Sequence, residues 1–497
     1  MPREGRAELA MGTPRWTSSA AAMGRGLLAF VSIALVACAL NPATGRKQLS
    51  FFSESYEIEL GAEVDREFLT TSREYEDAGL HRYVAELGGR LAAVSERPDL
   101  PWTFRLADDE IVNAFALPGG RIYVTRGLLA HLNREAELAG VLGHEIGHVS
   151  ARHAVNGLSR ELAITAGVLA GLALFDVDDD AQAIAALGLG LLFLKFGRNQ
   201  ERQADELGVR YAERAGLDPW GVVDVLRVLE QVSRAQGDGW FPVWLSTHPD
   251  PEGRWQRLAA ETGLDPAPRP GAVQPEVDAF LDRLDGLVYG PDPRHGVIRG
   301  NVYVHLRDRF QWTLPAGWEV ERQGQMVAAG NAEQNGQVVL LPRLAATERE
   351  AAAAFAAEDG VRAGESWDEN LGGLAARLVR FDGGLDGEEV RGLAAFVRTP
   401  ARVVSVLGVS ASDSWSRNQL ELERSVRSIG RIADPQHRAA APDRLAIVTL
   451  DRSMTVGEIA RRYSPQEEPA VLALLNQVDV DAPLPAGRRV KTIRAGR

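Results

Sequence analysis

The chain has 497 residues, enough for about two to four domains, and its 45% hydrophobic and 25% charged residues are the balance of a globular protein. Its 55 Lys and Arg residues against 68 Asp and Glu residues give a net charge of −13, which argues against nucleic acid as a partner because a phosphate-binding surface needs a basic excess. The single cysteine excludes an internal disulfide and a cysteine-based zinc site.

Residues 1–37 have the features of a lipoprotein-type signal peptide. A basic residue precedes an apolar run over residues 26–37, and small residues lead to Cys38. The run is shorter than the roughly 20 apolar residues that a membrane span needs. Leu35-Val36-Ala37-Cys38 resembles the bacterial lipobox, in which the cysteine is acylated and becomes the first mature residue. We therefore expect Cys38 to carry a lipid anchor, and Ala39 after it to allow sorting to the outer membrane in a diderm host.

Residues 38–290 are predicted to form the first domain, and their apolar pattern is mainly helical. A strand-like interval near residues 111–124 surrounds the turn signal Pro118-Gly119-Gly120. Two apolar runs, residues 162–175 and 183–196, are short for membrane spans and rich in Gly and Ala. We interpret them as buried helices or as a mobile hydrophobic cover over the site, with membrane contact as the alternative.

The segment His144-Glu145-Ile146-Gly147-His148 is an H-E-x-x-H motif. On a helix, the i, i+4 spacing brings both imidazoles to one face, one turn apart, where they can bind the same zinc ion. Asn133 is in position to cap this helix. Glu145 directly follows the first histidine, so it is predicted to be the general base that activates the attacking water.

A catalytic zinc ion keeps three protein ligands and leaves one position open, so a third ligand is expected downstream. The metzincin class would require Gly at 151 and His at 154, but the chain has Ala151 and Ala154, which excludes that class. Glu201 is the predicted third ligand, and Asp205, one turn further on, would accept a hydrogen bond from a ligand imidazole. His153 is expected about 140° around the helix from the motif's second histidine, either behind the ligands or at the surface.

Proline-rich segments mark the end of the first domain, and residues 291–435 are predicted to form an α+β domain of unknown role. No group of titratable residues at motif spacing occurs in it. We expect strands near residues 302–304, 310–314, 337–341 and 402–407, and helices near residues 348–357 and 413–428.

Residues 436–497 are predicted to be a linker followed by a small unit that resembles a LysM domain, in β-α-α-β order. The resemblance lies in Thr455–Tyr463, Leu474–Asn476 and Leu484–Gly487. The unit departs from the LysM pattern at Ser453-Met454, where a Gly-Asp pair usually opens the first helix. Contact with peptidoglycan and a role in packing therefore both remain open.

The H-E-x-G-H and E-x-x-A-D motifs, with Asn113–Gly120 upstream and Thr247-His248-Pro249 downstream, are similar to the HtpX and CAAX prenyl endopeptidase family of zinc metallopeptidases. The resemblance covers about residues 41–260 and extends to periplasmic lipoprotein members of that family. It implies a mainly α zincin domain of the gluzincin type with a small edge-strand sheet and one zinc ion per chain.

The family resemblance also implies roles for two segments outside the ligand helices. Asn113, Ala114, Phe115 and Ala116 would lie in an edge strand beside the zinc, where an extended substrate adds by main-chain hydrogen bonds. The loop of His248 would lie over the metal, so that the imidazole either occupies the fourth zinc position at rest or stabilises the oxyanion during turnover.

The sequence therefore predicts a zinc-dependent endopeptidase with His144, His148 and Glu201 as metal ligands. Its expected substrates are misfolded or unassembled envelope proteins, which it would hydrolyse in protein quality control at the periplasmic face of the outer membrane. The alternative is a chaperone-like or cell-wall-binding lipoprotein with little proteolysis. The complete ligand set together with Glu145 favours the enzyme.

Overall fold

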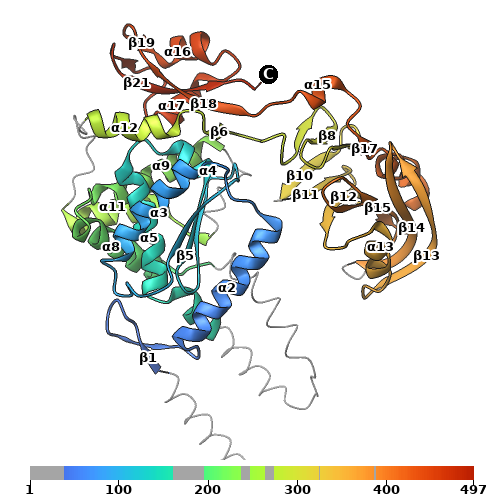
Figure 1. Cartoon of the computed structure of the whole chain (residues 1–497), viewed down its shortest axis with the longest axis horizontal. Coiled ribbons are helices and arrows are strands. Elements are labelled where there is room, and N and C mark those ends of the chain that lie inside the picture. Colours follow the sequence, from blue (N-terminus) through green and yellow to red (C-terminus); the bar gives the residue numbers. More distant parts are fainter. Residues whose placement is uncertain are drawn as a thin grey trace, which may run out of the picture.

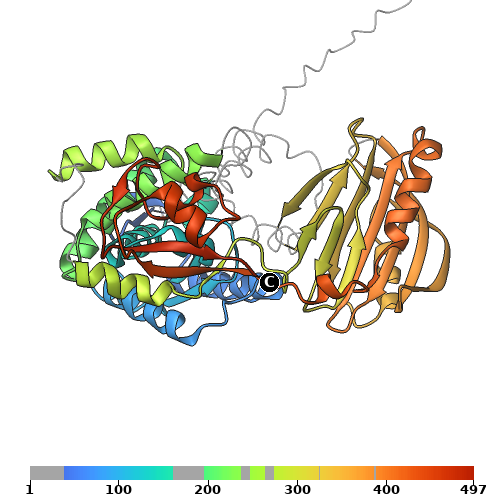
Figure 2. The same cartoon turned by 90° about the horizontal axis from the view of Figure 1, so that it is seen from above.

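The computed structural model describes residues 38–160, 195–236, 247–263, 274–323, 325–385 and 388–496. The predicted signal peptide and nearly all of the two apolar runs lie outside these residues. Figures 1 and 2 show a mainly helical body, with the C-terminal segment packed on it, and a separate β-rich body. Within the described ranges, no helix is both long enough and apolar enough to cross a membrane.

Helix α5 (Glu135–Ser150) lies at the centre of the helical body and packs against α8 (Arg198–Arg214) and α9 (Trp220–Gln236). Glycines allow this close approach: a Cβ on Gly147 would lie 3.0 Å from the Cα of Ala204, and a Cβ on Gly221 would lie 1.7 Å from the Ala136 carbonyl oxygen. The close packing of the two backbones allows polar side chains of α8 to contact those of α5. The other helices of this body are α2 (Glu54–Thr71), α3 (Ala78–Ala92), α4 (Arg126–His131), α11 (Pro251–Thr262) and α12 (Gln274–Leu284).

The start of α5 differs from the prediction that Asn133 caps it. The N-cap residue is Arg134, which makes no side-chain capping hydrogen bond. The Asn133 side-chain amide instead donates to the Leu475 carbonyl oxygen at 3.0 Å, and its backbone N–H donates to the Glu137 carboxylate at 2.6 Å. The Asn133 side chain therefore binds the C-terminal segment and does not cap the helix.

The predicted strand-like interval forms a hairpin of β4 (Ala114–Leu117) and β5 (Arg121–Thr125). Gly119 and Gly120 in its turn have φ of 74° and 95°, which favour glycine. Strand β3 (Thr103–Ala107) pairs with the other side of β5 in parallel, so the sheet order is β3-β5-β4. Strand β4 is therefore an edge strand, and it packs against α5.

The β-rich body contains a seven-stranded sheet in the order β10-β11-β12-β16-β15-β14-β13 and a four-stranded sheet in the order β17-β9-β8-β7. Helices α13 (Glu348–Ala356) and α14 (Trp415–Arg427) cover opposite faces of the larger sheet: Leu393 packs in the cluster that contains Leu422, whereas Ala394 packs in the cluster that contains Phe355. The predicted strands and helices of this region coincide with β8, β9, β12, β16, α13 and α14. The strands are β7 (Val297–Arg299), β8 (Val302–His305), β9 (Phe310–Thr313), β10 (Glu319–Gln323), β11 (Met326–Gly330), β12 (Gly336–Arg343), β13 (Val361–Leu371), β14 (Leu374–Leu385), β15 (Glu388–Arg398), β16 (Val403–Ala411) and β17 (Gly430–Arg431).

The C-terminal segment has the predicted strand-helix-helix-strand order, and its identity as a LysM-like unit stays a prediction. Strands β18 (Asp443–Thr449) and β21 (Arg489–Arg494) pair antiparallel, with α16 (Val456–Tyr463) and α17 (Pro469–Leu475) between them. Strand β18 also pairs with β6 (Val288–Tyr289), which follows α12.

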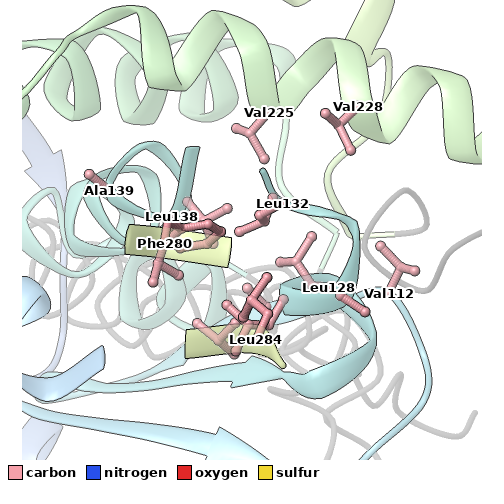
Figure 3. Packing of buried hydrophobic residues seen from close by; sticks show 14 of the residues in the cluster. Val112, Leu128, Leu132, Leu138, Ala139, Val225, Val228, Phe280 and Leu284 are labelled. Carbon is pink, nitrogen blue, oxygen red and sulfur yellow. The ribbon is translucent and has the colours of Figure 1, made fainter. Parts of the chain in front are cut away.

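The C-terminal segment and the helical body share one hydrophobic core. Leu445 of β18 and Leu475 of α17 belong to the same buried cluster as Leu138 of α5. Figure 3 shows part of this cluster, in which Phe280 and Leu284 of α12 lie close to α5 and α4. The chain thus leaves the helical body after β6, forms the β-rich body and returns to the core that it left (Figure 1).

Candidate metal centre

Two histidines of α5 form one side of the centre. The Nε2 atoms of His144 and His148 lie 3.0 Å apart, and each residue is 3% exposed. The i, i+4 spacing therefore places both imidazoles on one face of the helix, as the motif predicts. Burial lowers the pKa of His148 well below its ordinary value, although the Glu201 carboxylate opposes this shift, so the ring is neutral and able to bind a metal.

Glu201 and His248 complete a group of four possible ligands. Glu201 of α8 lies 3.3 Å from His148 Nε2 and 3.6 Å from His144 Nε2. His248, in the segment before α11, places Nδ1 3.0 Å from Glu201 Oε1 and 3.3 Å from His144 Nε2. One ligand atom from each of these residues lies within 4.8 Å of the others. Two imidazoles, a carboxylate and a third imidazole in a buried cluster suit a zinc ion.

Arg254 of α11 and Asp205 of α8 support the cluster from one side. Arg254 contacts Asp205 through Nε at 3.0 Å and Nη2 at 2.6 Å, and Nη1 lies 2.7 Å from Glu201 Oε2. Asp205 Oδ1 also lies 3.0 Å from His144 Nδ1, which leaves Nε2 to face the cluster. Burial alone would raise the pKa of Asp205, but Arg254 and His144 hold it below its ordinary value.

The charges on Glu201 and His248 depend on each other. Burial would raise the pKa of Glu201, but the nearby His248 and Arg254 lower it well below its ordinary value. Burial would lower the pKa of His248, but the Glu201 and Glu145 carboxylates raise it. The site therefore holds an ionised carboxylate ready to bind a cation.

Glu145 lies beside this cluster, and one oxygen of its carboxylate makes no hydrogen bond to the described residues. The residue is 1% exposed, and among the described residues its Oε1 has no hydrogen-bond partner. The same atom lies 3.7 Å from His248 Nε2. A pocket next to it is lined mainly by apolar side chains of α5 and α9, including Val141, Val222 and Leu226. A buried carboxylate oxygen without a partner is typical of a group that acts on a ligand.

Three contacts around the centre go beyond what the sequence specified. Only the packing of α11 shows that Arg254 joins Asp205 and Glu201. The Phe196 ring lies against His148, with 4.1 Å between ring centroids. His153 is 3% exposed and contacts His148, and burial lowers its pKa to about 4. Of the two places that the sequence left open for His153, behind the ligands or at the surface, the buried contact with His148 corresponds to the first.

The remaining predicted residues lie on other elements. Asn113 precedes β4 and exchanges hydrogen bonds with Thr125, while Ala114, Phe115 and Ala116 pair with β5. Cys38 begins β1 (Cys38–Leu40), which pairs antiparallel with β2 (Lys47–Leu49). Their roles in substrate binding and lipid attachment stay predictions.

A second group of potential ligands lies near the start of the β-rich body, at Asp108, Asp292 and His295. Two arginines already neutralise it: Arg126 Nε donates to Asp108 at 2.7 Å, and Arg294 Nη2 donates to Asp292 at 2.6 Å. With both carboxylates paired to guanidinium groups, this group is explained by the fold without a metal.

Comparison with known proteins agrees with this geometry. Residues 79–262 match the model of Peptidase family M48. The chain is 36% identical over 176 residues to the mitochondrial metalloendopeptidase OMA1 of Arabidopsis thaliana, covering 35% of each protein. It is 30% identical over 224 residues to the beta-barrel assembly-enhancing protease of Yersinia pestis, covering 43% of this chain and 46% of that one.

The beta-barrel assembly-enhancing protease of Escherichia coli strain K12 is 29% identical over 254 residues, which are 50% of this chain and 51% of the relative. The chain thus spans about half, or less, of the length of these relatives. The matched segment contains α5, α8 and α11 and so all residues of the cluster. Residues 79–262 are therefore similar in sequence to the metallopeptidases of family M48.

Proposed function

We propose that the chain is a zinc-dependent endopeptidase. The observation that carries the proposal is the buried cluster of His144, His148, Glu201 and His248 next to the unpartnered Glu145 carboxylate oxygen. The first three residues hold the ion, which fits the preference of zinc for imidazole and carboxylate ligands with one position left open.

The proposed chemistry is hydrolysis of a peptide bond. Held by these residues, a zinc ion would polarise the scissile carbonyl and lower the pKa of its water towards about 7. Glu145 Oε1 takes a proton from the attacking water and later returns it to the leaving amine. Asp205 holds His144 with Nε2 towards the cluster, and Arg254 holds both Asp205 and Glu201 in place.

His248 is assigned control of the open coordination position. Its Nδ1 lies near Glu201 and His144, while its Nε2 faces Glu145, so the imidazole lies between the proposed ligands and the proposed base. At rest it would act as a fourth ligand and keep the enzyme latent. An imidazole that moves aside could instead stabilise the oxyanion in the transition state.

The proposed substrates are misfolded or unassembled envelope proteins. Edge strand β4 packs against α5, so an extended segment that adds to it would lie close to the centre. Two of the relatives are named for enhancing β-barrel assembly, which suits a role in envelope quality control. A lipid on Cys38 would hold the protein at the periplasmic face of the outer membrane, and the C-terminal segment is the candidate for peptidoglycan contact.

The decisive experiment compares Glu145→Gln with His148→Ala and Glu201→Ala, each incubated with an unfolded outer-membrane protein. Glu145→Gln should retain about one zinc ion per chain and lose about 10²- to 10⁴-fold in rate, because only the base is removed. The two ligand variants should lose both metal and cleavage, and a chelator should silence the parent. A Glu201→Ala variant that binds zinc as tightly as the parent would show that the third ligand is misassigned.

A further inference from the structure

The chain turns sharply where the metal-binding helix ends, and this turn brings His153 back to the centre. Helix α5 ends at Ser150 with Ala151 as its C-cap, and Arg152 then adopts φ of 60°. This left-handed conformation is held by Arg152 Nε donating to the Glu57 carboxylate at 2.9 Å. A continued helix would carry His153 away from His148, whereas the turn leaves their Nδ1 atoms 3.1 Å apart.

A series of hydrogen bonds runs outward from His148. His153 Nε2 lies 3.1 Å from Gln203 Oε1 in α8, and Gln203 Nε2 donates to Asn41 Oδ1 at 3.5 Å. Asn41 Oδ1 also accepts the backbone N–H groups of Ala43 at 2.9 Å and Thr44 at 3.2 Å. Asn41, His153 and the metal-ligating His148 are all buried.

The contacts of Asn41 determine which ring nitrogens of His153 and His148 carry the protons. Backbone N–H groups can only donate, so the atom of Asn41 that they contact must be the oxygen, and Gln203 must present its NH2 group to it. Gln203 then offers its oxygen to His153, which places the proton of a neutral His153 on Nε2 and leaves Nδ1 as an acceptor. His148 must therefore carry its own proton on Nδ1, which leaves the Nε2 lone pair facing Glu201 and His144.

We infer that His153 and Gln203 are positioning residues that fix His148 in the tautomer able to bind metal through Nε2, with Asn41 setting the direction of the series. This rests on the proposed function of His148 as a ligand. If the Gln203 amide were reversed, His153 would carry its proton on Nδ1, and His148 would then carry its proton on Nε2. The loop just after Cys38 is thereby part of the metal centre.

The test measures zinc affinity by chelator competition in the full chain. His153→Leu should weaken zinc binding about 10- to 100-fold, the usual effect of removing a group that orients a ligand. His153→Asn keeps an acceptor oxygen near the position of Nδ1 and should restore most of the affinity. His131→Leu is the matched control, because His131 is also buried but contacts the Gly127 carbonyl oxygen and not the cluster.

A merely structural role of His153 would lower the melting temperature of the Leu and Asn variants without separating their zinc affinities, and would overturn the inference. Gln203→Glu keeps the acceptor and should bind zinc like the parent, whereas Gln203→Leu should bind it more weakly. If His148→Ala loses zinc while His153→Leu binds it like the parent, the series is wrong and the proposed function stands. If His148→Ala keeps zinc, the proposed function itself fails.

Discussion

In the helical body the ion pairs nearest the metal centre are buried, whereas the ion pair between β14 and β15 of the β-rich body faces solvent. Arg254 and Asp205 meet at 2.6 Å with side chains 3% and 1% exposed, and Arg391 and Asp382 meet at 2.8 Å with side chains 51% and 46% exposed. The contact distances are similar, but the surroundings are not. Water screens the second pair, so only the first depends on its partner for a stable charge.

The interiors of the two bodies show the same contrast. Alternate residues of β15 enter apolar clusters on both faces of the larger sheet, and these clusters hold it together without charge. Buried charge in the β-rich body is represented by Asp308, which accepts from Arg402 at 2.6 Å. Around α5, by contrast, Glu201, Asp205 and Arg254 are buried together beside three histidines. Placing so many ionisable groups out of water is costly, and the arrangement is explained by a site that binds a cation.

Removing one partner from each type of pair should change stability by very different amounts. Arg254→Leu removes the guanidinium from Glu201 and leaves Asp205 with only the longer guanidinium contact to Arg257, at 3.8 Å, so it should lower the free energy of unfolding of the metal-free protein by about 3–5 kcal/mol. Arg391→Leu should change it by about 0.5 kcal/mol or less. Chemical denaturation in the presence of a chelator measures both. Equal effects from the two variants would show that burial does not distinguish the pairs.

The parts of the site that follow local periodicity could be predicted from the sequence. His144 and His148 on one helix face, and Glu201 with Asp205 one turn apart on another helix, are spacings that a helix converts directly into geometry. Arg254 could not be assigned a role in this way, because its contacts depend on how α11 packs against α8. The angle expected for His153 was wrong because it assumed that the helix continues, whereas the turn at Arg152 ends it.

In the β-rich body the sequence predicted β8, β9, β12, β16, α13 and α14, but it did not predict β7, β10, β11, β13, β14, β15 or β17. An apolar run such as that of β16 marks a strand, and a 3.6-residue period marks a helix such as α14. The partner of the C-terminal segment was not predictable. An apolar pattern shows which face of an element is buried but not what covers it. The sequence therefore suggested a linker and a separate unit, whereas Leu445 and Leu475 pack into the core of the helical body.

Lys491 is a fully buried lysine at the contact between the C-terminal segment and the helical body. Its Nζ donates to the Ala130 carbonyl oxygen at 2.6 Å and also to that of Leu132, just before α5. Burial lowers the pKa of Lys491 to about 7, with Glu137 opposing the shift. The unfolded chain therefore binds more protons than the folded chain between about pH 7 and pH 10, and the contribution of Lys491 to stability rises with pH in that window.

The measurement is the free energy of unfolding of the parent minus that of Lys491→Met, followed from pH 6 to pH 9. The difference should be constant below about pH 7 and then change in favour of the parent by up to about 1.4 kcal/mol per pH unit. Lys47→Met, which removes an exposed lysine, should give a difference that does not change over the same window. A constant difference for Lys491→Met as well would mean that Lys491 stays charged in the folded protein.

The variant His248→Ala tests whether the buried imidazole of His248 contributes to activity rather than to stability. Arg254 and a bound metal ion both remain to neutralise Glu201 after His248→Ala, so the variant should lose less stability than Arg254→Leu. If the imidazole occupies the open position most of the time, its removal should raise the cleavage rate by up to about tenfold, the factor expected when only about a tenth of the molecules are competent. Rate and zinc content are measured together on one unfolded substrate. A lower rate with zinc retained would assign His248 to transition-state stabilisation, and an unchanged rate with unchanged zinc would remove it from the mechanism.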